Sequence, residues 1–483
     1  MPRRARFCLL SVMVLLVFSI LTGAMRQHIV GQQRGDDETL KRSRLRPSDP
    51  QATDLRLGQL AQGGLEAEPD QPQHLLIRNP LTSQQPISRN RVRAAFQERG
   101  AGRRGVVQQA QQESGVIGTE FGDPLPGITA KEFELFRVGL EDFTEVEAPD
   151  EGLGPVFNGR SCAECHSVPR IGGSSSITEV RAGIRREDGS FEEYPGGSVF
   201  QMFSIPPHET QVTMPPEVTV IARRKSLPLF GNGLVEAVPD ATLMALEDPE
   251  DRNGDGISGR AHRVQDKASN TMRIGRFGWK AQQATLLSFG AEAYRDEMGI
   301  TNDLFPDEAC PGGDCAKIRF FNPVPGMQDS RDLTTGLRGI DNFENFMKLL
   351  GPAPRGVIDG EVLEGEKVFQ AIGCTGCHTP SLLSGPSPVE ALSFKRFLPY
   401  GDFLLHDIGT GDGIGQGDAR PQEIRTPPLW GVRVRAPFLH DGRASTLREA
   451  IEMHSGEALG TRTRFETLSE PEKQVLLAFL RSL

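Results

Sequence analysis

The pattern of hydrophobic and polar residues changes along the chain, and each type of pattern predicts a different kind of structure. Residues 7–23 are almost wholly apolar and follow an arginine-rich start. Residues 25–115 are rich in Gln, Arg, Gly and Pro and contain few aromatic residues. From Phe121 onward, short segments with the helical spacing of apolar residues alternate with Gly and Pro. The pattern predicts an export segment, then a poorly ordered arm, then a folded region that is mainly α-helical.

A two-residue alternation, which is typical of strands, interrupts the helical spacing. It occurs in residues 177–184, 199–205 and 218–221. An Asp188-Gly189 pair follows the first of these segments, and such a pair between alternating segments indicates a hairpin. We therefore expect a β-containing insertion near residues 176–226.

Capping signals predict two helices near the C-terminus. Thr446 precedes a segment with helical spacing that runs towards His454. Ser469 and Glu472 form the Ser-x-x-Glu pattern of a capping box, so we expect a final helix over residues 471–483.

The strongest chemical signal is a five-residue pattern, Cys-x-x-Cys-His, that occurs twice. This spacing is typical of covalent c-type haem attachment, because both sulfurs meet one edge of the haem and the histidine that follows binds the iron. The pattern predicts two covalently bound haem c groups, and with them a role in electron transfer. Its residues are Cys162, Cys165, His166, Cys374, Cys377 and His378.

Two other kinds of site use Cys-x-x-Cys pairs. A structural zinc site brings its second pair within about 15–20 residues of the first, whereas Cys374 lies 209 residues after Cys165. A thioredoxin-like dithiol does not require a histidine after each copy. Both alternatives fit the sequence less well than haem does.

The N-terminal segment agrees with haem attachment outside the cytoplasm. Small residues before Ala24 permit cleavage there, so residues 1–24 are predicted to be a secretory signal, with an uncleaved membrane anchor as the alternative. We therefore expect a periplasmic protein. Removing this segment and its three arginines changes the formal net charge from −10 to −13. This negative net charge disfavours nucleic-acid binding. It favours, as the electron donor, a soluble redox protein whose surface is basic or locally complementary.

Cys310 and Cys315 lie outside the two haem patterns, at the ends of a Pro-Gly-Gly-Asp turn. The ends of such a turn can meet, and disulfides persist in exported proteins. We expect a structural disulfide here; a free pair is the alternative.

An internal repeat organises the folded region. Residues 277–286 align without gaps on residues 438–447, and each segment follows one haem pattern. The repeat predicts two cytochrome c-like domains, at residues 116–350 and 351–483, with the β insertion in the first.

The sixth iron ligand decides what each haem can do. A haem with two strong protein ligands passes electrons, while one with an open position binds small molecules. His454, on the predicted helix, is our candidate at the second haem, and the aligned residue in the first domain is Ala293. This contrast predicts a closed second haem and an open first haem. Other candidates are His406 and His440 at the second haem and His208, His262 and Met202 at the first.

A possible cation site lies between the two haem patterns, where Asp251, Asn253 and Asp255 alternate before Gly256. Oxygen ligands at alternate positions followed by a glycine are typical of the start of a calcium loop. The twelfth position is His262 instead of the closing glutamate, so a plain acidic turn is the alternative.

From about Phe121 to its end, the sequence resembles the di-haem oxidoreductase family of peroxidase-like proteins. These proteins are relatives of the bacterial di-haem cytochrome c peroxidases and of the MauG-type enzymes. The resemblance rests on seven segments, residues 152–159, 229–236, 276–281, 297–299, 405–409, 425–430 and 438–443.

The resemblance implies a division of labour, in which the N-terminal haem meets peroxide and the C-terminal haem receives electrons from a donor. Trp279 corresponds to a tryptophan between the haems that can relay electrons, although simple core packing is the alternative. Glu297 corresponds to the distal acid of the peroxidases, and Arg425 to a residue that neutralises a haem propionate. His454 falls where the peroxidases carry a distal Met or the MauG type a Tyr.

Three functions remain open from the sequence. The first is a peroxidase-like oxidoreductase in which hydrogen peroxide meets the first haem. The alternatives are a pure electron-transfer cytochrome and a MauG-like enzyme that oxidises a protein side chain.

Overall fold

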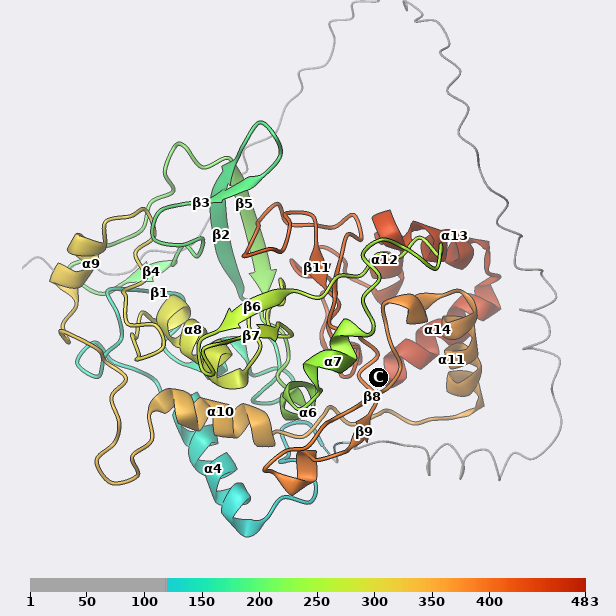
Figure 1. The fold of residues 1–483 in the computed structure, drawn as a ribbon, viewed down its shortest axis with the longest axis horizontal. Coiled ribbons are helices and arrows are strands. Elements are labelled where there is room, and N and C mark those ends of the chain that lie inside the picture. The colour runs from blue at the N-terminus through green and yellow to red at the C-terminus, as the bar shows by residue number, and fades with distance from the viewer. Residues whose placement is uncertain (1–117, 119) are drawn as a thin grey trace, which may run out of the picture. The chain divides into compact units, whose positions relative to one another are not determined.

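The computed structural model describes residues 118 and 120–483, which all belong to one compact unit (Figure 1). The export segment predicted at residues 1–24 and the arm predicted at 25–115 lie outside the described residues. Helices and small antiparallel sheets form the regular structure, joined by long loops, in agreement with a mainly helical fold. Among the described residues, no helix has both the length and the apolar character needed to cross a membrane.

Three helices form the centre of the first lobe, which we define as residues 120–350. They are α4 (Ala130–Thr144), α8 (Leu286–Met298) and α10 (Gly339–Leu349). Helix α10 packs against both α4 and α8 and buries Phe346 against Phe143, with ring centroids 4.7 Å apart. Gly139 allows helices α4 and α10 to approach closely. A Cβ at this position would lie only 2.3 Å from the Asn342 carbonyl oxygen. The first lobe is therefore held by tight helix packing around aromatic side chains.

The second lobe, residues 351–483, is built on a pair of packed helices, α11 (Gly360–Ala371) and α14 (Glu470–Ser482). Ser469 and Glu472 form the predicted capping box of α14. Phe369 of α11 packs against Phe479 of α14 with the rings tilted by 58° and their centroids 5.2 Å apart. The final helix and its cap are thus confirmed, with the helix beginning one residue earlier than predicted.

The predicted β insertion forms a three-stranded antiparallel sheet in the order β3-β2-β5. Its strands are β2 (Thr178–Arg185), β3 (Phe191–Glu193) and β5 (Val220–Lys225), and the Asp188-Gly189 turn joins the first two. Of the strand predicted over residues 199–205, only Phe203–Ser204 is a strand, β4, and it pairs with Val156–Phe157 outside the three-stranded sheet. Residues 199–201 are all buried, so this segment has no alternating faces; Val199 forms a single bridge to Arg181.

The remaining strands are short. They pair as β1 (Val156–Phe157) with β4 (Phe203–Ser204), β6 (Arg263–Asp266) with β7 (Thr271–Ile274), β8 (Leu382–Leu383) with β9 (Arg396–Phe397), and β10 (Leu405–His406) with β11 (Ile424–Arg425). The shorter helices are α5 (Cys162–Cys165), α6 (Asn232–Glu236), α7 (Asp240–Met244), α9 (Cys315–Phe321), α12 (Leu447–Glu452) and α13 (Leu459–Thr467). Single 3-10 turns are η1 (Cys374–Gly376), η2 (Glu390–Leu392), η3 (Val432–Val434) and η4 (Gly456–Ala458).

The internal repeat predicted from the sequence has the same local structure in both copies. Phe277 bridges Gln283 in the first lobe, and Phe438 bridges Ala444 at the aligned positions of the second. Two residues after each bridge, a threonine caps a helix, Thr285 for α8 and Thr446 for α12. The aligned sequences therefore fold as equivalent bridge, cap and helix units.

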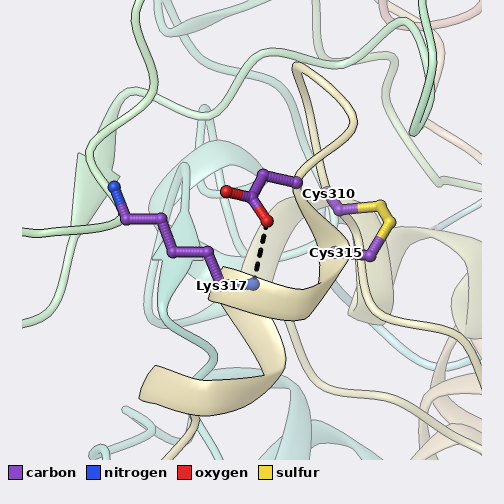
Figure 2. Close-up of a disulfide and its surroundings, with 4 residues drawn as sticks. Cys310, Cys315 and Lys317 are labelled. Carbon is purple, nitrogen blue, oxygen red and sulfur yellow. Dashed lines mark hydrogen bonds between the residues drawn. A yellow bond between two sulfur atoms is a disulfide. The ribbon is translucent and has the colours of Figure 1, made fainter.

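The predicted disulfide between Cys310 and Cys315 is present, with the two Cα atoms 4.9 Å apart (Figure 2). It closes the turn that leads into α9, whose N-cap is Asp314. The Asp314 carboxylate accepts a hydrogen bond from the Lys317 backbone N–H at 3.0 Å. The disulfide and the cap together fix the start of this helix.

Candidate functional site

Two large cavities each contain one Cys-x-x-Cys-His segment. The first cavity, in the first lobe, has an empty volume of about 1240 Å³ including its opening to solvent, and the second, in the second lobe, about 1260 Å³. Helix α5 and His166 face the first cavity, and η1 and His378 face the second. The sequence patterns are thus placed at cavities, where bound groups can be held.

Both motif histidines hold Nδ1 against a backbone carbonyl oxygen, and the His166 ring has the backbone of Leu227 as a second neighbour. Nδ1 of His166 lies 3.0 Å from the Gly173 carbonyl oxygen, and Nδ1 of His378 lies 3.0 Å from the Tyr400 carbonyl oxygen. Because a carbonyl only accepts, Nδ1 carries the proton and Nε2 keeps its lone pair, as an iron ligand requires. Burial lowers the pKa of His166 and lowers that of His378 to about 4, so both rings are neutral at pH 7.

The backbone of each motif makes a tight turn that brings the cysteines to the same side. The His166 N–H donates to the Cys162 carbonyl at 3.1 Å, and the His378 N–H donates to the Cys374 carbonyl at 2.9 Å. All four motif cysteines are free of disulfides. The chemistry of these donors therefore fits covalent haem c at both sites.

Buried cations on the cavity walls give a further test of that fit. Arg224 lines the first cavity, and its buried Nη2 has no hydrogen-bond partner. Arg425 and Arg435 line the second cavity, and burial lowers the pKa of Arg425 to about 9 and that of Arg435 to about 10. Buried guanidinium groups need anionic partners, and haem propionates are such partners. The positions of Arg224 and Arg425 therefore suit propionate binding.

Three histidines besides His378 line the second cavity, and they differ in what their ring nitrogens contact. His454 bonds through Nδ1 to the Ala450 carbonyl at 2.6 Å, which leaves Nε2 free. His440 has its ring against Trp279, with centroids 6.1 Å apart. The prediction that His454 lies on a helix is wrong, because α12 ends at Glu452 and His454 follows in the next turn. The end of the helix still places it on the cavity wall.

His406 is committed to two carboxylates. Its Nε2 lies 2.9 Å from Asp402 and its Nδ1 lies 2.8 Å from Glu457, and the ring is buried. Burial alone would lower the pKa of His406, but the Asp402 carboxylate and the sulfur of Cys377, which lies 3.5 Å from Nδ1, outweigh it and hold the pKa well above its ordinary value. Both nitrogens of His406 are therefore donors, so it has no lone pair for iron.

None of the three candidates for a sixth ligand at the first haem lines the first cavity. His262 uses both ring nitrogens, Nδ1 to the Lys280 carbonyl at 2.8 Å and Nε2 to the Asp418 N–H at 3.1 Å. His208 is exposed and bonds to Ser204, and Met202 lies away from the cavity wall. Ala293, the residue aligned with His454, does line this cavity.

Acidic side chains surround the first cavity near Ala293. Glu297 projects from the last turn of α8, and its Oε2 accepts a hydrogen bond from Asn158 Nδ2 at 2.6 Å. Glu179 and Arg181 of β2 line the same cavity and form an ion pair at 2.7 Å. The sequence interpretation missed this pair, although an acid and a base two residues apart lie on the same face of a strand.

Trp279 lines both cavities. Its indole N–H donates to the Lys225 carbonyl at 2.8 Å, and the Arg425 N–H donates to the Trp279 carbonyl at 2.8 Å. Its neighbour His440 is the residue aligned with it in the repeat. Trp279 and His440, at equivalent positions of the two copies, thus lie next to each other on the wall of the second cavity, and Trp279 also lines the first.

A second repeat, which the sequence interpretation missed, supports these contacts. Residues 225–231 read Lys-Ser-Leu-Pro-Leu-Phe-Gly and residues 425–431 read Arg-Thr-Pro-Pro-Leu-Trp-Gly. Gly231 and Gly431 both have positive φ, 71° and 72°, and each begins a helical turn. The signal was present as a Pro-Leu-aromatic-Gly repeat. It makes Lys225 the counterpart of Arg425, and each lines the cavity of its own lobe.

A buried ion cluster joins the lobes beside Trp279. Asp412 accepts from Arg224 at 2.7 Å and lies 3.1 Å from Lys280 Nζ, and all three side chains are at most 1% exposed. Burial would raise the pKa of Asp412, but the two cations outweigh it and lower the pKa to about 2. The cluster therefore depends on an ionised Asp412.

Asp412→Asn is expected to lower the free energy of unfolding by about 2 kcal/mol at pH 7, given about 1.4 kcal/mol per pKa unit. A carboxylate with a depressed pKa stabilises the fold above its unfolded value, and this contribution disappears as the pH falls through the folded value. The stability difference between variant and parent should shrink between about pH 4 and pH 2. Denaturant titrations across this range measure it; a difference independent of pH would contradict the role of the charge.

The predicted calcium residues form a loop closed by its own hydrogen bonds. Asp251 accepts from the Gly256 N–H at 3.2 Å, and Asn253 Oδ1 accepts from the Asp255 N–H at 2.9 Å. Within residues 118 and 120–483, no group of three or more His, Cys, Asp or Glu side chains is placed to hold a metal ion. Calcium binding stays a prediction of the sequence.

Comparison with known proteins gives one family match. A family model described as "Di-haem oxidoreductase, putative peroxidase" matches residues 210–483, more than half of the chain. The matched segment contains the second Cys-x-x-Cys-His copy, Trp279 and Glu297.

Curated relatives are distant. The chain is 27% identical over 129 residues to cytochrome c551 peroxidase of Nitrosomonas europaea, covering 27% of this chain and 36% of that protein. It is 26% identical over 208 residues to the methylamine utilization protein MauG of Methylorubrum extorquens, covering 39% of this chain and 54% of that protein. The alignments thus span about a third to a half of these relatives.

Solved structures show only a weak likeness. The dihaem peroxidase BthA from Burkholderia thailandensis is 16% identical and has a TM-score of 0.32, with 76% of this chain and 92% of that chain covered.

Proposed function

This chain belongs to the di-haem oxidoreductase family of peroxidase-like proteins, and we propose that it is an exported c-type cytochrome that reduces a peroxide. Peroxide meets the first cavity, and electrons from a soluble redox protein enter through the second. The N-terminal sequence, with its predicted signal, supports a periplasmic location, either free or tethered by an uncleaved anchor.

The arrangement of the two cavities is the main observation that supports this proposal. Each has one Cys-x-x-Cys-His segment on its wall, and Trp279 contributes to both walls. The surroundings of the two are unlike each other, since the second has a histidine with a free nitrogen where the first has Ala293. Two haem sites joined by an aromatic side chain, one closed and one open, suit an enzyme that separates electron entry from substrate reaction.

Bound haem would supply one-electron chemistry at both sites and a place for peroxide where an axial position is open. His166 and His378 would bind iron through Nε2, and Arg224 and Arg425 would neutralise propionates. Glu297 would move a proton between the two oxygens of the substrate, because it lines the open cavity and burial and the neighbouring Glu179 raise its pKa well above its ordinary value.

The side chains between the cavities have a positioning role. Trp279 is fixed by hydrogen bonds at its indole N–H and its carbonyl, so its ring stays between the cavities. A buried ion cluster holds the segment that contains Trp279, because the next residue, Lys280, belongs to this cluster together with Arg224 and Asp412. Trp279 thereby offers a fixed route for electrons between the two sites.

His454→Ala is expected to open the second haem. In the parent this haem should be low-spin, and in the variant it should bind added imidazole or cyanide, because His454 is held through Nδ1 with Nε2 free, whereas His406 uses both ring nitrogens. Optical and electron paramagnetic resonance spectra measure the change. A second haem that stays low-spin and closed in His454→Ala would contradict the assignment.

The reciprocal variant is Ala293→His, which places a histidine at the aligned position of the first cavity. It should convert the first haem towards the low-spin state and reduce ligand binding there, while leaving the second haem unchanged. Together the two variants test whether one sequence position sets the difference between the sites.

Turnover tests the function itself. The haem-loaded protein, half-reduced by an artificial donor, should consume hydrogen peroxide and oxidise the donor in proportion. If neither haem binds small ligands or reacts with peroxide in any redox state, the enzyme proposal fails and a pure electron carrier remains.

A further inference from the structure

A carboxyl pair links the β insertion to the wall of the first cavity. Glu179 lies on β2 and Glu297 on α8, and both line the cavity. Their carboxyl groups are hydrogen-bonded to each other. Two ionised carboxylates cannot share a hydrogen bond, so one of the two carries a proton.

The surrounding contacts decide which one. Arg181 donates to both oxygens of Glu179, from Nε at 2.7 Å and from Nη2 at 3.2 Å, and its Nη1 is held by Ser198 at 3.0 Å. A bidentate guanidinium contact favours the ionised form of Glu179. Asn158 donates to only one oxygen of Glu297, which leaves the other oxygen free to carry the proton.

The electrostatic directions agree with this geometry. Burial would raise the pKa of Glu179, but Arg181 outweighs it and lowers that pKa. Burial and the charge of Glu179 raise the pKa of Glu297 well above its ordinary value. The other charged groups on this cavity wall are Arg224, Lys225, Glu292 and Asp296, and of these Arg224 also favours the ionised Glu179.

We propose that Glu179 is the proton partner of Glu297, an ionised carboxylate that keeps one proton on Glu297 facing the first cavity. This inference rests on the proposed function for its use, because the retained proton is the one that Glu297 would give to a peroxide oxygen. Glu179 is a positioning residue, since it acts through Glu297. Glu179 and Arg181 both come from the β insertion, which the second lobe lacks, so the insertion equips only the first cavity for acid catalysis.

The pair can be observed without peroxide, by infrared spectroscopy of the haem-loaded protein. At about pH 7 the parent should show buried protonated carboxyl absorption that shifts in D₂O, and the component of it that remains in Glu292→Gln should be absent from Glu297→Gln. Glu292→Gln is the matched control, because this carboxyl lies on the same wall and burial raises its pKa to about 7. Loss of the band in Glu292→Gln but not in Glu297→Gln would overturn the proposal.

Two variants should move the titration of this band in opposite directions. Glu179→Gln removes the neighbouring negative charge, so the apparent pKa of Glu297 should fall by about one unit or more. Arg181→Gln removes the cation, so the same pKa should rise. Shifts of the same sign, or no shift in either correctly folded variant, would overturn the proposal; if one variant does not fold, the sign in the other decides.

The outcome separates this inference from the proposed function. Band shifts as expected in a protein that does not react with peroxide would support the pair and reject the peroxidase. Peroxide turnover with no protonated Glu297 would support the peroxidase and reject the pair.

Discussion

Glu297→Gln is expected to slow the cleavage of hydrogen peroxide by about 10²–10⁴-fold, with both haems still attached, the range for loss of a positioned acid–base group. Glutamine keeps the size of the side chain and can still bond to Asn158, but it cannot give and take a proton. The rate is measured by stopped-flow mixing of peroxide with the half-reduced protein. A rate equal to that of the parent would remove Glu297 from the chemistry.

A suitable control is Glu308→Gln. Glu308 is another partly buried acid whose pKa is raised by burial, and it accepts a hydrogen bond from Asn322 at 2.8 Å. It lines neither cavity. Its replacement should leave the peroxide reaction unchanged, so a comparable loss in both variants would indicate a general effect on folding.

Loss of covalent haem is the second large effect. Cys162→Ala and Cys374→Ala should each reduce the haem content from two per chain to one, because each variant removes a sulfur from one attachment site only. The pyridine haemochrome assay and intact-protein mass spectrometry measure the content. Cys310→Ala breaks the disulfide and should keep both haems. A purified parent that holds zinc and no haem would contradict the assignment of both motifs.

Local signals were enough to predict several elements of the fold. The capping box at Ser469 and the Asp188-Gly189 hairpin were predictable because a few neighbouring residues determine each of them. The strand expected at residues 199–205 was only partly correct, since Phe203–Ser204 forms β4 whereas the consecutive residues Val199 and Phe200 are both buried and have no alternating faces. The helix that Thr446 caps ends at Glu452, before it reaches His454. Nothing in the sequence pattern indicated this end.

Some residues of the candidate site could likewise be predicted from the sequence, and others could not. The attachment cysteines and proximal histidines are contiguous in the chain, so their pattern identified them. The contact between Glu179 and Glu297 joins residues 118 positions apart, and the Arg224–Asp412 pair joins residues 188 positions apart. Such pairs depend on how the sheet and helices pack, which one sequence does not reveal. The repeat at residues 225–231 and 425–431 was visible, and it would have indicated Lys225 as the counterpart of Arg425.

The ligation and spin state of each haem, in the resting and half-reduced protein, test the central claim most directly. Combined optical and electron paramagnetic resonance spectra, with and without cyanide, would assign them. The account predicts a low-spin second haem bound by His378 and His454, and a first haem that binds cyanide at least when half-reduced. Two haems that both remain low-spin and closed to cyanide in every redox state would contradict it.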